Sequence, residues 1–149
     1  MVTLERIENP RMMEVRLPDP GPRAGAPNRL YIFGGIAVFE WTHETDDRWE
    51  GWVHDSLHIS MISIPGVPRI FDDQVSNSIH TVSLAQFSFS DTWRTGDTWG
   101  YSIDSVSAYF PHDHALDLAD FGLNVELSLR GYKTNLFRLS FQLMVLARV

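Results

Sequence analysis

Apolar and polar residues alternate with a period of two along most of the chain after residue 28. In the clearest stretch, residues 121–130, Phe121 and every second residue after it are apolar, while the positions between them are polar or glycine. This alternation is typical of a β-strand that buries one face. Residues 137–147 repeat it, after the short turn-like segment GYKTN at 131–135. The spacing predicts that the two strands form a hairpin.

Four segments upstream show the same period less regularly, at residues 30–41, 49–64, 79–90 and 99–110. The last two change phase once, which predicts a β-bulge in each. The polar segment HETDDR at 43–48 reads as a turn between the first two. The longer link from 64 to 78 has enough residues to pass from one sheet to another. No segment carries an apolar stripe of helical spacing and helical length.

About seven long strands without helices predict an all-β domain. We favour an antiparallel β-sandwich over a closed meander β-barrel, because the 64–78 link suits a crossing between two sheets. The body resembles an immunoglobulin-like sandwich in general look. It lacks the Cys…Trp…Cys signature of that family, so the resemblance implies an architecture and no function.

The first 28 residues differ from the rest in composition. Five of the eight prolines precede residue 28, and the segment PDPGPRAGAP at 18–27 can form neither a helix nor an interior strand. We therefore divide the chain into a proline-rich N-terminal arm, residues 1–28, and a single all-β domain, residues 29–149. The alternating residues Met13, Val15 and Leu17 predict a short edge strand in the arm, and a disordered leader fits the composition equally well.

Two predicted strands are apolar on both faces. These are residues 30–39 and the C-terminal strand, whose second face carries Leu136, Met144 and Leu146. On an isolated sandwich they would leave an apolar patch, and such patches usually mark an interaction surface. Either the N-terminal arm or an identical subunit is expected to cover them, and we favour self-association.

Charge and composition exclude some partners. With 19 acidic and 12 basic residues the formal net charge is -7, and the basic residues are not clustered. Neither nucleic acid nor an anionic membrane surface is therefore expected as a partner. The chain has no cysteine, which excludes a thiolate nucleophile or a cysteine-based zinc site. No secretory signal or transmembrane segment is visible, so a cytoplasmic location is expected, and no cofactor is expected.

The repeat in SDTWRTGDTWG, residues 90–100, is the first candidate site. Trp93 and Trp99 could stack on a planar or sugar ligand, while Asp91 and Asp97 accept its hydroxyl protons. In the alternative interpretation the aspartates bond the backbone of their own turn and the indoles cap the core.

Histidines form the second candidate. On an extended segment His112 and His114 project to the same side, as two imidazoles that bind one metal do, and Asp117 could add a carboxylate. A polar turn between strands is the simpler interpretation, and we predict no metal site. His54, His58 and His80 either line a cavity or lie on a solvated sheet face. The sequence has no nucleophile elbow and no phosphate-binding loop.

These observations favour a non-catalytic interaction module that self-associates or docks on a protein partner. Two alternatives remain. One is a small-molecule or glycan binder that uses the loop tryptophans, including Trp49 and Trp52. The other is a cofactor-independent cyclase or isomerase that works in a barrel lumen with a histidine or aspartate as acid and base. Such an enzyme depends on shape and a few polar groups, so it would leave little trace in the sequence.

Overall fold

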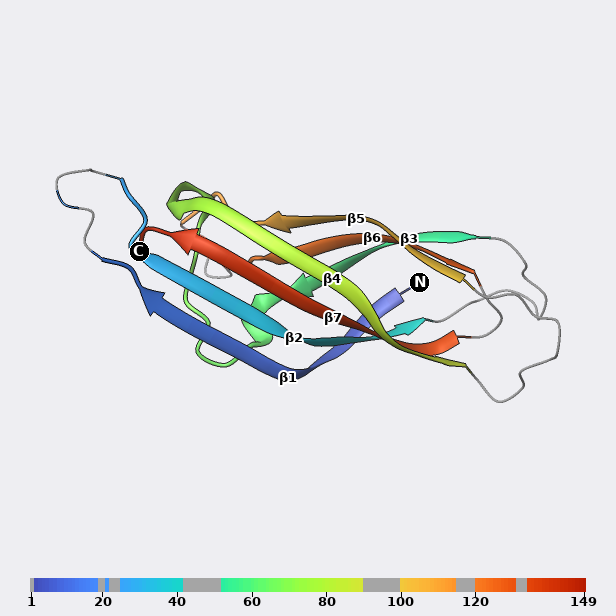
Figure 1. Cartoon of the computed structure of the whole chain (residues 1–149). Coiled ribbons are helices and arrows are strands. Elements are labelled where there is room, and N and C mark those ends of the chain that lie inside the picture. Colours follow the sequence, from blue (N-terminus) through green and yellow to red (C-terminus); the bar gives the residue numbers. More distant parts are fainter. Residues whose placement is uncertain are drawn as a thin grey trace.

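A computed structural model covers the chain and describes residues 2–18, 21, 25–41, 52–89, 100–114, 120–130 and 134–149. Seven β-strands and two short 3-10 helices form in these residues (Figure 1). The elements are β1 (Val2–Arg16), β2 (Arg29–Trp41), β3 (Val53–Ser60), η1 (Met61–Ser63), η2 (Asp72–Gln74), β4 (Val75–Phe89), β5 (Gly100–Tyr109), β6 (Gly122–Arg130) and β7 (Thr134–Ala147). The described residues contain no α-helix.

The strands form two antiparallel sheets packed face to face. Sheet A has the order β1-β2-β7-β4, and sheet B has the order β3-β6-β5. The sheet edges meet where β4 lies next to β5 and β1 lies next to β3 (Figure 1). Neither sheet closes into a barrel. The prediction of an all-β sandwich is confirmed, and the alternative of a closed meander barrel is wrong.

The chain changes sheets at four of its connections. β2, β3, β4 and β5 alternate between sheets A and B, and β6 and β7 again lie in different sheets. The predicted crossing at 64–78 is confirmed, since it joins β3 to β4. The predicted hairpin of residues 121–130 with 137–147 is wrong. A short connection also suffices for this crossing, because packed sheets lie only about 10 Å apart, which about three extended residues span.

The strand order departs from that of an immunoglobulin constant domain. In that fold the second strand pairs with the fifth, and the sixth pairs with the seventh. Here β2 pairs with β7, and β6 pairs with β5. The fifth and last strands have therefore exchanged sheets, and the likeness is limited to the two-layer architecture.

The core lies between the two sheets and uses the alternation seen in the sequence. Odd-numbered residues of β2, β6 and β7 point inward, and the twelve largest fully buried side chains are all apolar. They are Phe33, Val38, Phe39, Leu57, Ile59, Met61, Ile70, Phe121, Leu123, Phe137, Leu139 and Leu143. Within this core Phe33 meets Phe121 edge to face, with ring centroids 5.3 Å apart. All of these residues except Val38, which is discussed below, belong to the cluster shared by the two sheets.

Both predicted bulges are present. The pairing of β5 with β6 shifts register between Ile103 and Ser105, and β4 shifts against β7 between Leu84 and Gln86. Each extra residue changes which parity faces the core, which explains the phase changes in the sequence.

The N-terminal residues form a longer strand than the sequence predicted. β1 pairs with β2 from Val2 to Arg16, well beyond the short piece around Met13 and Val15. Residues 19–20 and 22–24 of the proline-rich segment lie outside the described part of the chain. The division into an arm and a domain stays a prediction. In the part of the chain that the structure describes, no helix is long and apolar enough to span a bilayer.

Candidate functional site

The face of sheet A that points away from the core is the candidate site, and we call it the outer face. Its side chains line up in rows because neighbouring strands pair residue for residue. Two adjacent rows are almost wholly apolar: Met13, Ile32, Met144 and Ile79 in the first, and Val15, Leu30, Leu146 and Asn77 in the second. Within them Met13 and Ile79 are 58% and 60% exposed. The doubly apolar strands predicted from the sequence thus meet in one patch, which we call the apolar rows.

At the opposite end of the outer face the protein covers its own apolar surface. Val38 points outward from β2 and yet is fully buried. Its register neighbours are Arg6 and Arg138, which both bind Glu8, at 2.7 Å and 3.3 Å. Arg138 also donates to Gln86 on β4 at 2.8 Å. This polar bridge spans all four strands, and its aliphatic stems account for the burial of Val38. Nothing comparable lies over the apolar rows among the described residues.

A groove of about 680 Å³ lies between these two ends of the outer face. It exists because one of the two adjacent glycines of β2, Gly34, leaves the outer face without a side chain there. A Cβ on Gly34 would have only the Phe141 carbonyl oxygen near it, at 3.4 Å, so the space above this residue is open. A Cβ on Gly35 would instead point at Ile7 and the Phe141 ring, at 2.9 Å and 3.3 Å, on the core side.

Beside these glycines β1 is bulged. Its register against β2 shifts between Glu8 and Arg11, and Asn9 has a positive φ of 49°. Pro10 follows within the bulge and has no amide hydrogen to donate, as is common on edge strands. The bulge places Arg11 opposite Gly34, so its side chain crosses the open space above that glycine.

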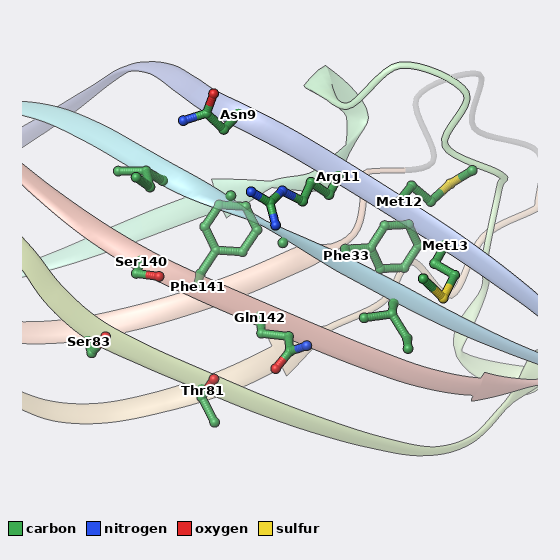
Figure 2. A pocket seen from close by; sticks show the side chains of 14 residues that line it. Asn9, Arg11, Met12, Met13, Phe33, Thr81, Ser83, Ser140, Phe141 and Gln142 are labelled. Atoms are coloured by element: carbon green, nitrogen blue, oxygen red, sulfur yellow. The ribbon is translucent and has the colours of Figure 1, made fainter.

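Polar side chains of β4 and β7 line one side of the groove (Figure 2). Thr81 is paired with Gln142, and Ser83 with Ser140, so these four residues form two neighbouring cross-strand pairs. In Figure 2 the Arg11 side chain extends over β2 toward this group. Met13 and Ile32, from the first apolar row, line the other end of the groove.

The ligand residues predicted from the sequence, Trp93, Trp99, Asp91 and Asp97, lie outside the described residues, as does Trp49. Trp52, just before β3, is 46% exposed. The stacking hypothesis therefore stays a prediction.

The two histidines proposed as metal ligands contact different aspartates. His112 hydrogen-bonds with Asp72, and the Nε2–H of His114 donates to Asp73 at 3.0 Å, both in η2. His114 also stacks on Phe71, with ring centroids 3.9 Å apart. Asp117 lies outside the described residues, within which no three His, Asp or Glu side chains gather as a metal site.

Within the described residues His54 and His58 lie apart from His80. His54 and His58 are exposed on the outward side of sheet B. His80 projects from β4, where its Nε2–H donates to the Val106 carbonyl at 3.0 Å and links the two sheets. His58 instead meets the ring of Tyr109 edge to face, with centroids 6.1 Å apart.

Sheet B holds a Ser–His–Asp group that sequence reasoning missed. The Ser128 hydroxyl lies 2.6 Å from the His54 Nδ1 and donates to Asp104, which also accepts from Ser102 at 2.6 Å. In a catalytic triad the histidine lies between the serine and the carboxylate. Here the serine occupies the middle position and is buried, so the group fastens β3, β6 and β5 together. Its only signal in the sequence is the phase change at the β5 bulge, which adds Asp104.

Acid should destabilise the fold through two carboxylates. Hydrogen bonds from Ser102 and Ser128 lower the pKa of Asp104, and hydrogen bonds from Arg6 and Arg138 lower the pKa of Glu8. The unfolded chain, with ordinary values of 3.8 and 4.5, therefore takes up protons first as the pH falls. Their contribution to stability is present above those values and is lost as the pH falls through the lowered folded values. We expect the unfolding temperature, followed by circular dichroism, to drop in this acid range.

The variant Asp104→Asn should be less stable than the wild type at neutral pH, and its unfolding temperature should drop less on acidification. Glu5→Gln also removes one exposed negative charge and serves as the charge-matched control. An acid dependence that is the same in Asp104→Asn and wild type would contradict the assignment.

Comparison of the chain with protein-family models, curated proteins and solved structures finds no match in any of the three.

Proposed function

We propose that the protein is a non-catalytic interaction module and that a second copy of the chain binds to the outer face of sheet A. The observation that carries the proposal is the pair of apolar rows. Seven apolar side chains stand side by side across four strands there, and Met13 and Ile79 are more than half exposed. Monomeric proteins rarely leave a contiguous patch of this kind uncovered.

The size and charge of the face support a second copy as the occupant. Four strands about 4.8 Å apart and about 13 residues long give a flat area of about 800 Å², which is what each partner contributes to a standard interface. The apolar rows contain no charged residue. The centre of the contact would therefore bury no charge, while Arg6, Glu8, Arg11 and Arg138 of the same face would lie outside the apolar rows.

The alternative of a barrel enzyme has lost its main support, because the two sheets of the described residues stay open and apolar side chains pack between them. The Ser–His–Asp group does not replace it, since its serine donates to the aspartate.

Sedimentation of the full chain tests the proposal. We expect the mass to rise with concentration from that of one chain, 17.0 kDa, toward that of two. A mass of one chain at every concentration would contradict self-association.

A further inference from the structure

The groove on the outer face has features that the apolar rows do not explain. Its volume of about 680 Å³ falls within the range of small-molecule sites, about 300 to 1,000 Å³. It combines one cation, five neutral hydrogen-bonding side chains, of which Thr81, Ser83, Ser140 and Gln142 lie together on β4 and β7 and Asn9 lies on β1, and an apolar end. This combination defines the chemistry of a ligand independently of self-association.

Arg11 supplies the positive charge. Two other arginines on the outer face, Arg6 and Arg138, are both bound to Glu8. Arg11 is exposed, and the described residues provide no acidic partner for it. A guanidinium matches a carboxylate with two parallel hydrogen bonds. A single free arginine suits one carboxylate better than a doubly charged phosphate, which usually gathers several cations.

The neutral groups favour a ligand rich in hydroxyls. Thr81, Ser83, Ser140 and Gln142 are all exposed, and their side chains have no hydrogen-bond partner among the described residues. Neighbouring strands lie about 4.8 Å apart, and alternate residues of one strand lie about 7 Å apart. The four side chains thus outline a patch that one sugar unit can cover, with donors and acceptors at its corners.

The apolar end completes the match. Met13 and Ile32 line the groove beside the polar patch. They can contact the C–H face of a sugar ring while its hydroxyls meet the polar side. A hydrocarbon acid would leave the four polar side chains unused, and a neutral sugar would leave Arg11 unused. We propose that the groove binds an acidic saccharide, with the carboxylate on Arg11 and the sugar hydroxyls on the Thr81–Gln142 and Ser83–Ser140 pairs.

Calorimetric titration with linear trigalacturonate tests this proposal. We expect binding to the wild-type chain and at least about tenfold weaker binding to Arg11→Gln, since a hydrogen bond to a charged group contributes about that factor. Arg11→Lys keeps the positive charge but cannot donate two parallel hydrogen bonds, so its affinity should lie between those of the wild type and Arg11→Gln. Gly34→Leu should abolish binding, because its side chain would fill the open space above β2. Arg11 is exposed, so Arg11→Gln keeps the test valid if Gly34→Leu fails to fold.

Neutral galactotriose and triglutamate complete the design. We expect the neutral trisaccharide to bind at least about tenfold more weakly than trigalacturonate. No binding of trigalacturonate, equal binding to Arg11→Gln, or equal binding of the neutral sugar would overturn the proposal. Tighter binding of triglutamate would overturn it in favour of an acidic peptide.

The same titration of Ile79→Gln separates this proposal from self-association. Ile79 belongs to the apolar rows and does not line the groove. If Ile79→Gln is monomeric and binds trigalacturonate as tightly as the wild type, the saccharide site is upheld independently of self-association. If the monomeric variant no longer binds, the site needs the second copy, and the proposal of a site on the single chain is overturned.

Discussion

Replacing Gly122 with alanine is expected to lower the stability of the chain more than the same replacement at Gly34 or Gly35. A Cβ at this position would lie 2.0 Å from the Ile59 carbonyl oxygen and 3.2 Å from the Ser60 Cα. Both obstacles are backbone atoms of β3, so no side-chain rotation relieves the clash. β6 is the central strand of sheet B, and moving it would disturb its pairing with both neighbours. We expect a loss of more than about 3 kcal/mol in the free energy of unfolding, measured by urea denaturation.

Gly34→Ala is the matched control, because the nearest atom to its Cβ would be at an ordinary contact distance of 3.4 Å. It should change the free energy of unfolding by less than about 0.5 kcal/mol. Gly35→Ala, whose Cβ would meet the Ile7 side chain and the backbone of Glu8, should fall between the two. If Gly122→Ala and Gly34→Ala proved equally stable, the close approach of β6 and β3 would be wrong.

Substituting Ile79 with glutamine is expected to have the largest effect on self-association. Ile79 is the most exposed apolar side chain of the apolar rows, so it contributes little to the stability of the single chain. Burying an isoleucine side chain is worth about 1.5 to 3 kcal/mol, and a symmetric pair of chains buries it twice. Because Ile79 is 60% exposed in the single chain, only that share remains to be buried, and the dissociation constant should rise at least about twentyfold.

Ile62→Gln provides the comparison, since Ile62 is 53% exposed on η1, outside the outer face. It removes the same side chain from the surface and should leave the dissociation constant of the pair unchanged. Equal weakening by both variants would mean that general surface hydrophobicity, and not the apolar rows, drives association.

The sequence predicted burial better than it predicted pairing. Period-two alternation identified the inward residues of β6 and β7 and the bulges of β4 and β5, because each depends on neighbouring residues alone. The partner of a strand depends on residues far along the chain. Residues 121–130 and 137–147 present apolar faces that suit a hairpin and a pair of facing sheets equally well, and the structure has the second arrangement.

The candidate site was predictable only in part. The excess apolar residues of β2 and β7 were visible in the sequence, and they form most of the apolar rows. The groove was not, since it needs Gly34 on β2, the bulge at Asn9 and the polar pairs of β4 and β7 in register. The alternation predicts that Ser128 is exposed on the outward face of β6. In the structure it is buried there, where it contacts His54 and Asp104.

The central claim is that a second copy covers the outer face of sheet A, and site-specific thiol labelling tests it most directly. The chain has no cysteine, so Asn77→Cys and Ile62→Cys each introduce one reactive thiol, the first in the apolar rows of the outer face and the second away from that face. We predict that alkylation of Asn77→Cys slows as the protein concentration rises, while alkylation of Ile62→Cys keeps a constant rate. Rates that are independent of concentration at both positions, in a chain that nevertheless associates, would place the interface elsewhere and contradict the account.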